Sequence, residues 1–165
     1  MKTILFLRHA KSTWDDPDWT DLTRPLNSKG LKDASMIADI IFDNYKLAPD
    51  VIYSSPALRA LMTANIFAKK INYPENKIVI DEDIYKNGTK HIKNLLQKQN
   101  EDIRTVMFFG HNPDITSLAS YFSGYRFEHV PTCGAVCVDF DQCLWQDILK
   151  FNGVTRFFEY PGKYA

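Results

Sequence analysis

Three absences limit what this chain of 165 residues can be. Its three cysteines, Cys133, Cys137 and Cys143, are odd in number and lack the paired spacing of a zinc knuckle, so we expect reduced, mostly buried thiols. Its 20 basic and 20 acidic side chains cancel, so no overall field favours nucleic acid or a membrane surface. No apolar run is long enough for a membrane span. We therefore expect one cytoplasmic domain over residues 1–165, without nucleic-acid or membrane partners.

The apolar pattern predicts an α/β fold. Short apolar runs predict strands over residues 4–7, 50–53, 77–80 and 105–109. Helical spacing predicts helices over 28–45, 57–70 and 91–99 and one after Asp114. Residues 134–140 and 144–160 alternate in places, which favours antiparallel strands closing a sheet edge. This order predicts a three-layer α/β/α sandwich with a mostly parallel central sheet.

Chemically active side chains follow three of the predicted strands. Arg8-His9 comes directly after the first strand, and Arg59 lies just behind Ser54-Ser55-Pro56, where the second strand passes into a helix. Gly110-His111-Asn112 follows the strand over 105–109. Because the carboxyl ends of parallel strands share one edge of a sheet, these segments are expected to build one site.

This combination favours an anionic substrate. Guanidinium groups offer rigid forks of donors suited to phosphate or carboxylate, and the first turn of a helix, where Arg59 is expected, also attracts anions. One histidine can act as a nucleophile on phosphorus while the other helps the arginines to stabilise charge in the transition state. The residues alone therefore predict a site for an anion, phosphate or carboxylate, with histidines suited to phosphoryl transfer.

The same segments resemble a known family. Leu7-Arg8-His9-Ala10 resembles the signature of the histidine phosphatase superfamily, which includes the cofactor-dependent phosphoglycerate mutases. The segment 54–60, followed by Thr63-Ala64, is similar to the second motif of that family, and 110–112 to its third. Within the superfamily, the chain most resembles the SixA-type phosphohistidine phosphatases. The features that carry this resemblance are the short length, Arg24-Pro25-Leu26 with Lys29-Gly30, and Pro131-Thr132 with Gly134-Ala135.

The resemblance implies a phosphoglycerate mutase-like fold and a mechanism without a metal or another cofactor. It implies that His9 attacks phosphorus and becomes phosphorylated, while Arg8, Arg59 and His111 hold the phosphoryl oxygens. Nearby arginines are expected to lower the pKa of His9 and so keep it neutral. Ser12 and Asn112 are possible substrate-binding residues, but each could equally be a turn or helix cap.

The substrate is open at this stage between a phosphohistidine in a protein and a small phosphorylated molecule. Phosphate monoesters need an acid for the leaving alkoxide, and Glu82 or Asp83 is a candidate, although a solvated turn is the simpler interpretation. Imidazole leaves more easily, so a site without a good acid favours phosphohistidine. A phosphoprotein-binding module without activity is the alternative from another class. The loop from Trp14 to Trp19 either contacts a partner or folds over the core.

Overall fold

One six-stranded sheet organises the computed structural model, which describes residues Met1 to Ala165. Across the sheet the strand order is β3-β2-β4-β1-β5-β6. The first four of these strands are parallel, whereas β5 is antiparallel to β1 and β6 is antiparallel to β5. The strands are β1 (Lys2–Arg8), β2 (Val51–Ser54), β3 (Val79–Ile80), β4 (Thr105–Gly110), β5 (Ala135–Phe140) and β6 (Val154–Glu159).

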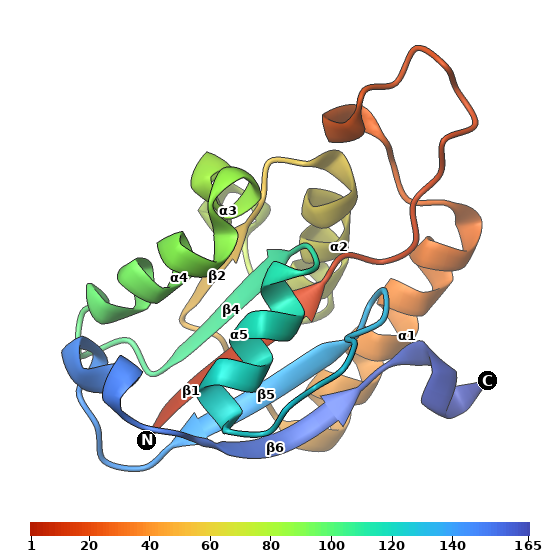
Figure 1. Cartoon of the computed structure of the whole chain (residues 1–165). Helices are drawn as coiled ribbons and strands as arrows, with labels where there is room; N and C mark the ends of the chain where they lie inside the picture. The colour runs from red at the N-terminus through yellow and green to blue at the C-terminus, as the bar shows by residue number, and fades with distance from the viewer.

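Helices cover both faces of the sheet, which gives the three layers predicted from the sequence (Figure 1). The α-helices are α1 (Ser28–Tyr45), α2 (Leu58–Lys70), α3 (Glu82–Lys86), α4 (Gly88–Gln97) and α5 (Asp114–Ser123). One core cluster packs α1 and α2 against one face, and a second packs α4 and α5 against the other. Successive side chains of a strand point to opposite faces, so Leu5 of β1 belongs to the first cluster and Phe6 to the second.

Short 3-10 helices account for most differences from the predicted elements. They are η1 (Asp21–Thr23), η2 (Glu75–Lys77), η3 (Trp145–Lys150) and η4 (Pro161–Tyr164). The predicted strand over 77–80 shrinks to Val79–Ile80 because η2 precedes it. The predicted alternation within 144–160 is wrong where η3 lies. Trp145 and Ile148, three residues apart, are both buried, and that spacing belongs to a 3-10 helix.

The sequence-based boundaries hold for α1 and, to within one residue, for α2. Asn27 caps α1 by accepting a hydrogen bond from the backbone of Gly30 at 2.7 Å. In contrast, α4 begins at Gly88 rather than at His91. Glu82, expected in a solvated turn, instead begins the short helix α3, which Asp81 caps.

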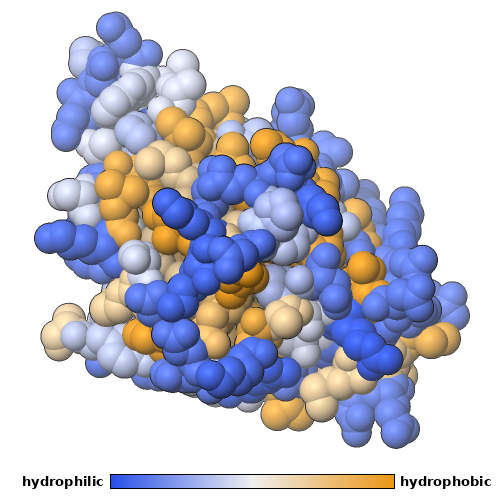
Figure 2. All heavy atoms as spheres, turned by 180° about the vertical axis from the view of Figure 1, so that it is seen from behind, coloured by the Kyte–Doolittle hydropathy of each residue, from blue (hydrophilic) through white to orange (hydrophobic).

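The surface is mostly polar, and the structure has no membrane-spanning helix, as the short apolar runs of the sequence predict. Seen from behind, the molecule is largely hydrophilic, with apolar atoms in small scattered groups (Figure 2). No helix is both long enough and apolar enough to cross a membrane. All three cysteines are free thiols. Cys133 and Cys137 are buried and Cys143 is partly buried, as expected from the sequence.

Candidate active site

Strand pairing brings the three predicted segments to one edge of the sheet. Arg8 lies opposite Gly110 in the parallel β1–β4 register, and the amide of His9 donates to the carbonyl of Gly110 at 3.0 Å. On the other side of β4, the amide of Ser55 donates to the carbonyl of Phe109, also at 3.0 Å. The imidazole rings of His9 and His111 lie 5.2 Å apart between centroids. The residues that follow β1, β2 and β4 therefore share one site.

The ring of His9 is oriented and neutral. It is 9% exposed, and its Nδ1 lies 2.7 Å from the carbonyl oxygen of Ala10. A carbonyl only accepts, so Nδ1 carries the proton and Nε2 of the neutral ring keeps its lone pair. Burial above all, together with the charges of Arg59, Arg8 and Arg24, lowers the pKa of His9 to about 4. Burial, rather than the arginines expected from the sequence, is the largest cause.

Thr63 fixes the backbone that orients this histidine. Its hydroxyl accepts a hydrogen bond from the amide of Ala10 at 3.0 Å and donates to the carbonyl of Arg59 at 2.8 Å. The side chain of Thr63 is fully buried in α2. It therefore ties the loop after β1, whose Ala10 carbonyl holds His9, to the helix that carries Arg59.

His111 is also neutral, and its two nitrogens have distinct partners. Nη2 of Arg59 lies 3.4 Å from Nδ1 of His111, and Nε2 lies 2.7 Å from Oγ of Ser55. Because a guanidinium group only donates, Nδ1 is the acceptor and Nε2 donates to Ser55. Burial above all, together with the charges of His9 and Arg59, lowers the pKa of His111 to about 3. We call Arg8, His9, Arg59 and His111 the floor of the site.

Three arginines have an unsatisfied donor at this site. The buried side-chain polar atoms of the chain that lack a hydrogen-bond partner are the Nε atoms of Arg8, Arg24 and Arg59. These are the same three arginines whose charges lower the pKa of His9. A buried donor without a partner is costly, and an oxyanion can accept from several guanidinium groups at once. The donor set therefore fits a phosphoryl group.

Arg8 has two partners in the segment before β5. Its Nη1 donates to the carbonyl of Val130 at 3.2 Å and lies 3.4 Å from Nε2 of His129. His129 is exposed, but it contacts the floor rather than solvent alone. The segment before β5 thus fixes the orientation of Arg8.

A group of three residues missed by the sequence analysis lies next to the floor, and we call Asp21, Arg24 and Tyr85 the rim. The Asp21 carboxylate accepts from Arg24 at 3.1 Å, from Arg59 at 3.1 Å and from the Tyr85 hydroxyl. Its backbone carbonyl also accepts from Arg59. The loop that carries Asp21 and Arg24 projects beyond the edge where β1 and β4 end (Figure 1).

Arg24 is held on three sides. Besides Asp21, it donates to the hydroxyl of Ser12 at 2.7 Å, and its guanidinium carbon lies 3.9 Å from the centroid of the Trp14 ring. Trp14 remains 60% exposed, so it stacks on Arg24 and also faces solvent. The Arg24-Pro25-Leu26 segment was noticed as a family feature, but nothing in its spacing linked Arg24 to His9.

The two possible binding residues have different surroundings. Ser12 contacts Arg24 and so borders the site. Asn112 instead accepts from the backbone and hydroxyl of Thr116 at 3.2 and 2.9 Å and donates to the carbonyl of Val130 at 2.8 Å. Both ends of its amide are occupied, which is the capping alternative considered above.

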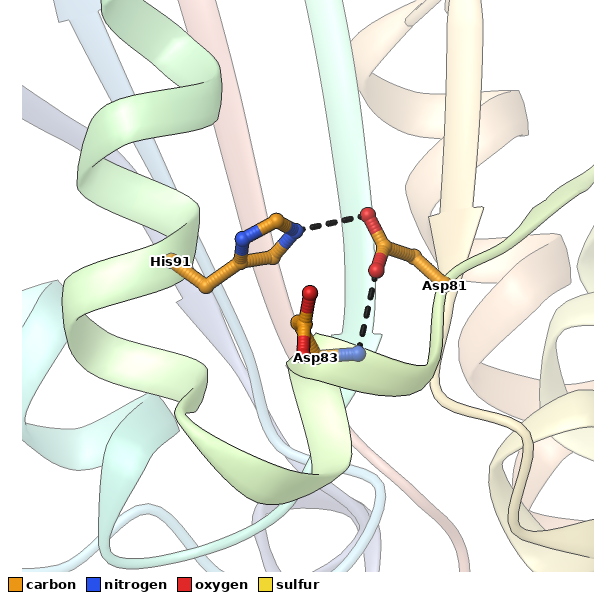
Figure 3. A group of neighbouring side chains, drawn as sticks. All are labelled: Asp81, Asp83 and His91. Carbon is orange, nitrogen blue, oxygen red and sulfur yellow. Dashed lines mark hydrogen bonds and ion pairs between the residues drawn. The ribbon is translucent and has the colours of Figure 1, made fainter.

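Neither acid candidate from the sequence contacts the floor. Glu82 is 76% exposed and forms an ion pair with Lys86 at 3.8 Å. Asp83 points toward His91 and Asp81 (Figure 3), and none of these three bonds to Arg8, His9, Arg59 or His111. Within α3 it is Tyr85, not Glu82 or Asp83, that reaches the site.

The group in Figure 3 is the set of side chains whose spacing most resembles that of metal ligands. One ligand atom from each of Asp81, Asp83 and His91 lies within 4.8 Å of the others. Both oxygens of Asp81 are used within the protein, Oδ1 by the amide of Asp83 at 3.0 Å and Oδ2 by His91 at 2.7 Å. These bonds give Asp81 the role of a helix cap that also orients His91.

Comparison with known proteins agrees with this geometry. The profile of the histidine phosphatase superfamily (branch 1) matches residues 4–85, the part that carries Arg8, His9 and Arg59. An uncharacterised chloroplastic protein of Arabidopsis thaliana is 28% identical over 160 residues, covering 92% of this chain and 72% of its own. Phosphoglycerate mutase 1 of Saccharomyces cerevisiae is 32% identical over 74 residues, which span 42% of this chain but only 29% of the mutase.

Solved structures match nearly the whole chain. A protein of Agrobacterium tumefaciens described as a phosphohistidine phosphatase SixA is 28% identical, with a TM-score of 0.78 over 98% of this chain and 99% of that one. The protein histidine phosphatase SixA complexed with tungstate is 20% identical, with a TM-score of 0.83 over 99% of each chain. The chain therefore belongs to the histidine phosphatase superfamily and is a phosphatase with the fold of the SixA-type proteins.

Proposed function

We propose that this phosphatase removes the phosphoryl group from phosphohistidine in a protein, through a phosphorylated His9 and without a metal or other cofactor. The observation that carries the proposal is the state of His9. Its Nδ1 proton is held by Ala10, its ring is neutral, and three arginines with unsatisfied Nε donors surround it. This is the arrangement that in-line attack on an anionic phosphoryl group needs.

The chemistry follows from the tautomer. Nε2 of His9 attacks phosphorus, the bond to the leaving group breaks, and its electron pair departs with that group. Water then attacks the same phosphorus and loses a proton, and the P–N bond pair returns to Nε2. Burial keeps His111 neutral, but the negative charge of a bound phosphoryl group counteracts that effect and favours a proton on Nδ1 of His111. This N–H then donates to a phosphoryl oxygen. Arg8, Arg59 and Arg24 hold the remaining charge.

The surroundings favour phosphohistidine over a monoester. An alkoxide leaving group needs a proton, and neither Glu82 nor Asp83 contacts the floor. The carboxylate that does bond to the arginines of the site, Asp21, has its pKa lowered to about 2 by hydrogen bonds from Tyr85 and Arg59, against the opposing effect of burial. An ionised carboxylate has no proton to give. SixA structures similar to this chain support the same substrate class, and the thiols suit the reducing cytoplasm.

Phosphate release tests the proposal. The substrates are a phosphotransfer domain phosphorylated on histidine and p-nitrophenyl phosphate, each with wild type and His9→Ala, in the presence of EDTA. We expect rapid release from the phosphoprotein that depends on His9 and is insensitive to EDTA. Turnover of the ester alone would point to a monoester phosphatase, and binding without turnover of either would point to a phosphoprotein-binding module.

A further inference from the structure

The rim carboxylate is placed where the leaving group must depart. In-line displacement puts the leaving group on the side of phosphorus opposite the nucleophile. His9 is buried at 9% exposure, so its leaving group moves outward, toward the open side of the site. The Asp21 side chain is 41% exposed and is bonded to Arg59, which also contacts His111. It therefore borders the floor and is open to solvent.

Asp21 retains the capacity for one more hydrogen bond. An ionised carboxylate has about four acceptor positions. Oδ2 accepts from Arg59 and Tyr85, and Oδ1 accepts from Arg24, which leaves one position on Oδ1. The carboxylate is thus fixed in place by three donors and can still accept from a donor on a substrate.

We propose that Asp21 selects the leaving group, because its carboxylate accepts the ring N–H of the departing imidazole and so favours a P–N bond over the P–O bond of an alkyl ester. This inference rests on the proposed function and deepens it. Asp21 is a specificity-determining residue in this account, since it contacts the leaving group and not the phosphorus.

The proton and electron balance requires no acid at the breaking bond. The ring of phosphohistidine takes its only ring N–H proton from solvent, on the nitrogen that does not carry phosphorus, and Asp21 stabilises that cationic ring. When Nε2 of His9 attacks, the electron pair of the P–N bond returns to the ring and cancels its charge. The ring leaves as neutral imidazole and keeps the N–H that faces Asp21. An alkoxide has no such proton, and its growing negative charge is repelled by the carboxylate.

Asp21→Asn separates these effects because it removes the charge and keeps the shape. We expect kcat/KM for the histidine-phosphorylated domain to fall about 10- to 100-fold, the range of one charge-assisted hydrogen bond. Turnover of p-nitrophenyl phosphate, whose leaving group is a stable anion that takes nothing from Asp21, should fall much less, and circular dichroism shows separately that the variant is folded. Asp18→Asn is the matched control, because Asp18 lies exposed in the same loop and its side chain has no hydrogen bond.

The pH dependence gives a second readout. By stabilising the protonated ring, Asp21 raises the pKa of the bound substrate, so the loss of activity at high pH should move to lower pH in Asp21→Asn. Equal losses on both substrates with an unmoved pH profile would overturn the inference and leave Asp21 as a support for Arg59 and Arg24. If wild type itself failed to cleave phosphohistidine while cleaving the ester, the proposed function would fail, and the inference with it.

Discussion

The floor and the rim of the active site lie side by side but are built differently. Each floor residue is positioned by the backbone of a strand end or of the helix that follows it, as the β1–β4 register shows for His9 and His111. The rim instead depends on side chains that reach across the chain, such as the bonds from Arg59 and Tyr85 to Asp21. The floor suits attack on phosphorus, and the rim suits the choice of leaving group. Substitutions in the two regions should therefore have different signatures.

The largest effect is expected at His9, the proposed nucleophile. His9→Ala removes the attacking nitrogen, so activity on every phosphoryl substrate should fall about a thousandfold or more. Initial-rate assays on the phosphoprotein and on p-nitrophenyl phosphate measure this loss. A loss confined to one substrate would contradict a shared nucleophile.

The next largest effect is expected for the arginines, and it should differ between Arg59 of the floor and Arg24 of the rim. Arg59→Ala should lower kcat about 10²- to 10³-fold, as for the loss of one preorganised donor to transition-state charge. The loss of kcat in Arg24→Ala should be roughly tenfold smaller. Arg24 contacts Ser12 and Trp14, whereas Arg59 is the arginine that contacts His111. Equal losses would show that Arg24 belongs with the floor.

A smaller effect tests the support beneath the floor. Thr63→Val keeps the shape of the side chain but leaves the buried amide of Ala10 without its acceptor. Such a loss costs about 1–3 kcal/mol in the free energy of unfolding. Urea denaturation measures that cost, and kcat should fall while KM changes little, because the orientation of His9 and not substrate binding is affected.

The pH dependence of stability tests the neutral histidines. His9 and His111 have folded-state pKa values below the ordinary 6.5, so between the two values the unfolded chain binds more protons. Their contribution to stability is full above pH 6.5 and is lost as the pH falls toward 4. The thermal unfolding midpoint should therefore drop on acidification, and less steeply in His9→Asn/His111→Asn. An equal drop in both proteins would show that other groups are responsible.

The smallest effect is expected at the acid candidates. Glu82→Gln and Asp83→Asn should change turnover of either substrate by less than about twofold, as exposed side chains away from the reacting groups. Loss of ester turnover alone in either variant would revive the hypothesis of a carboxylic acid and a small monoester substrate.

The same division explains how much the sequence could predict. Arg8, His9 and His111 were predictable because apolar runs mark strands, and parallel strands end at one edge. Asp21 and Tyr85 were not, because they lie 64 positions apart and meet through a side-chain bond. Local periodicity carries no signal for such a contact. The short 3-10 helix over Trp145–Lys150 was missed because a single buried pair three residues apart is too short a pattern to identify a helix in the sequence.

The measurement that tests the central claim most directly is capture of the phosphorylated enzyme. Wild type and His111→Asn are mixed with the histidine-phosphorylated domain, quenched in alkali where phosphohistidine survives, and digested for peptide mass spectrometry. The account predicts one phosphoryl group on the peptide that contains His9, at Nε2, and none in His9→Ala. Turnover of the phosphoprotein with no phosphoryl group on His9 at any time point, or with the label on His111 instead, would contradict it.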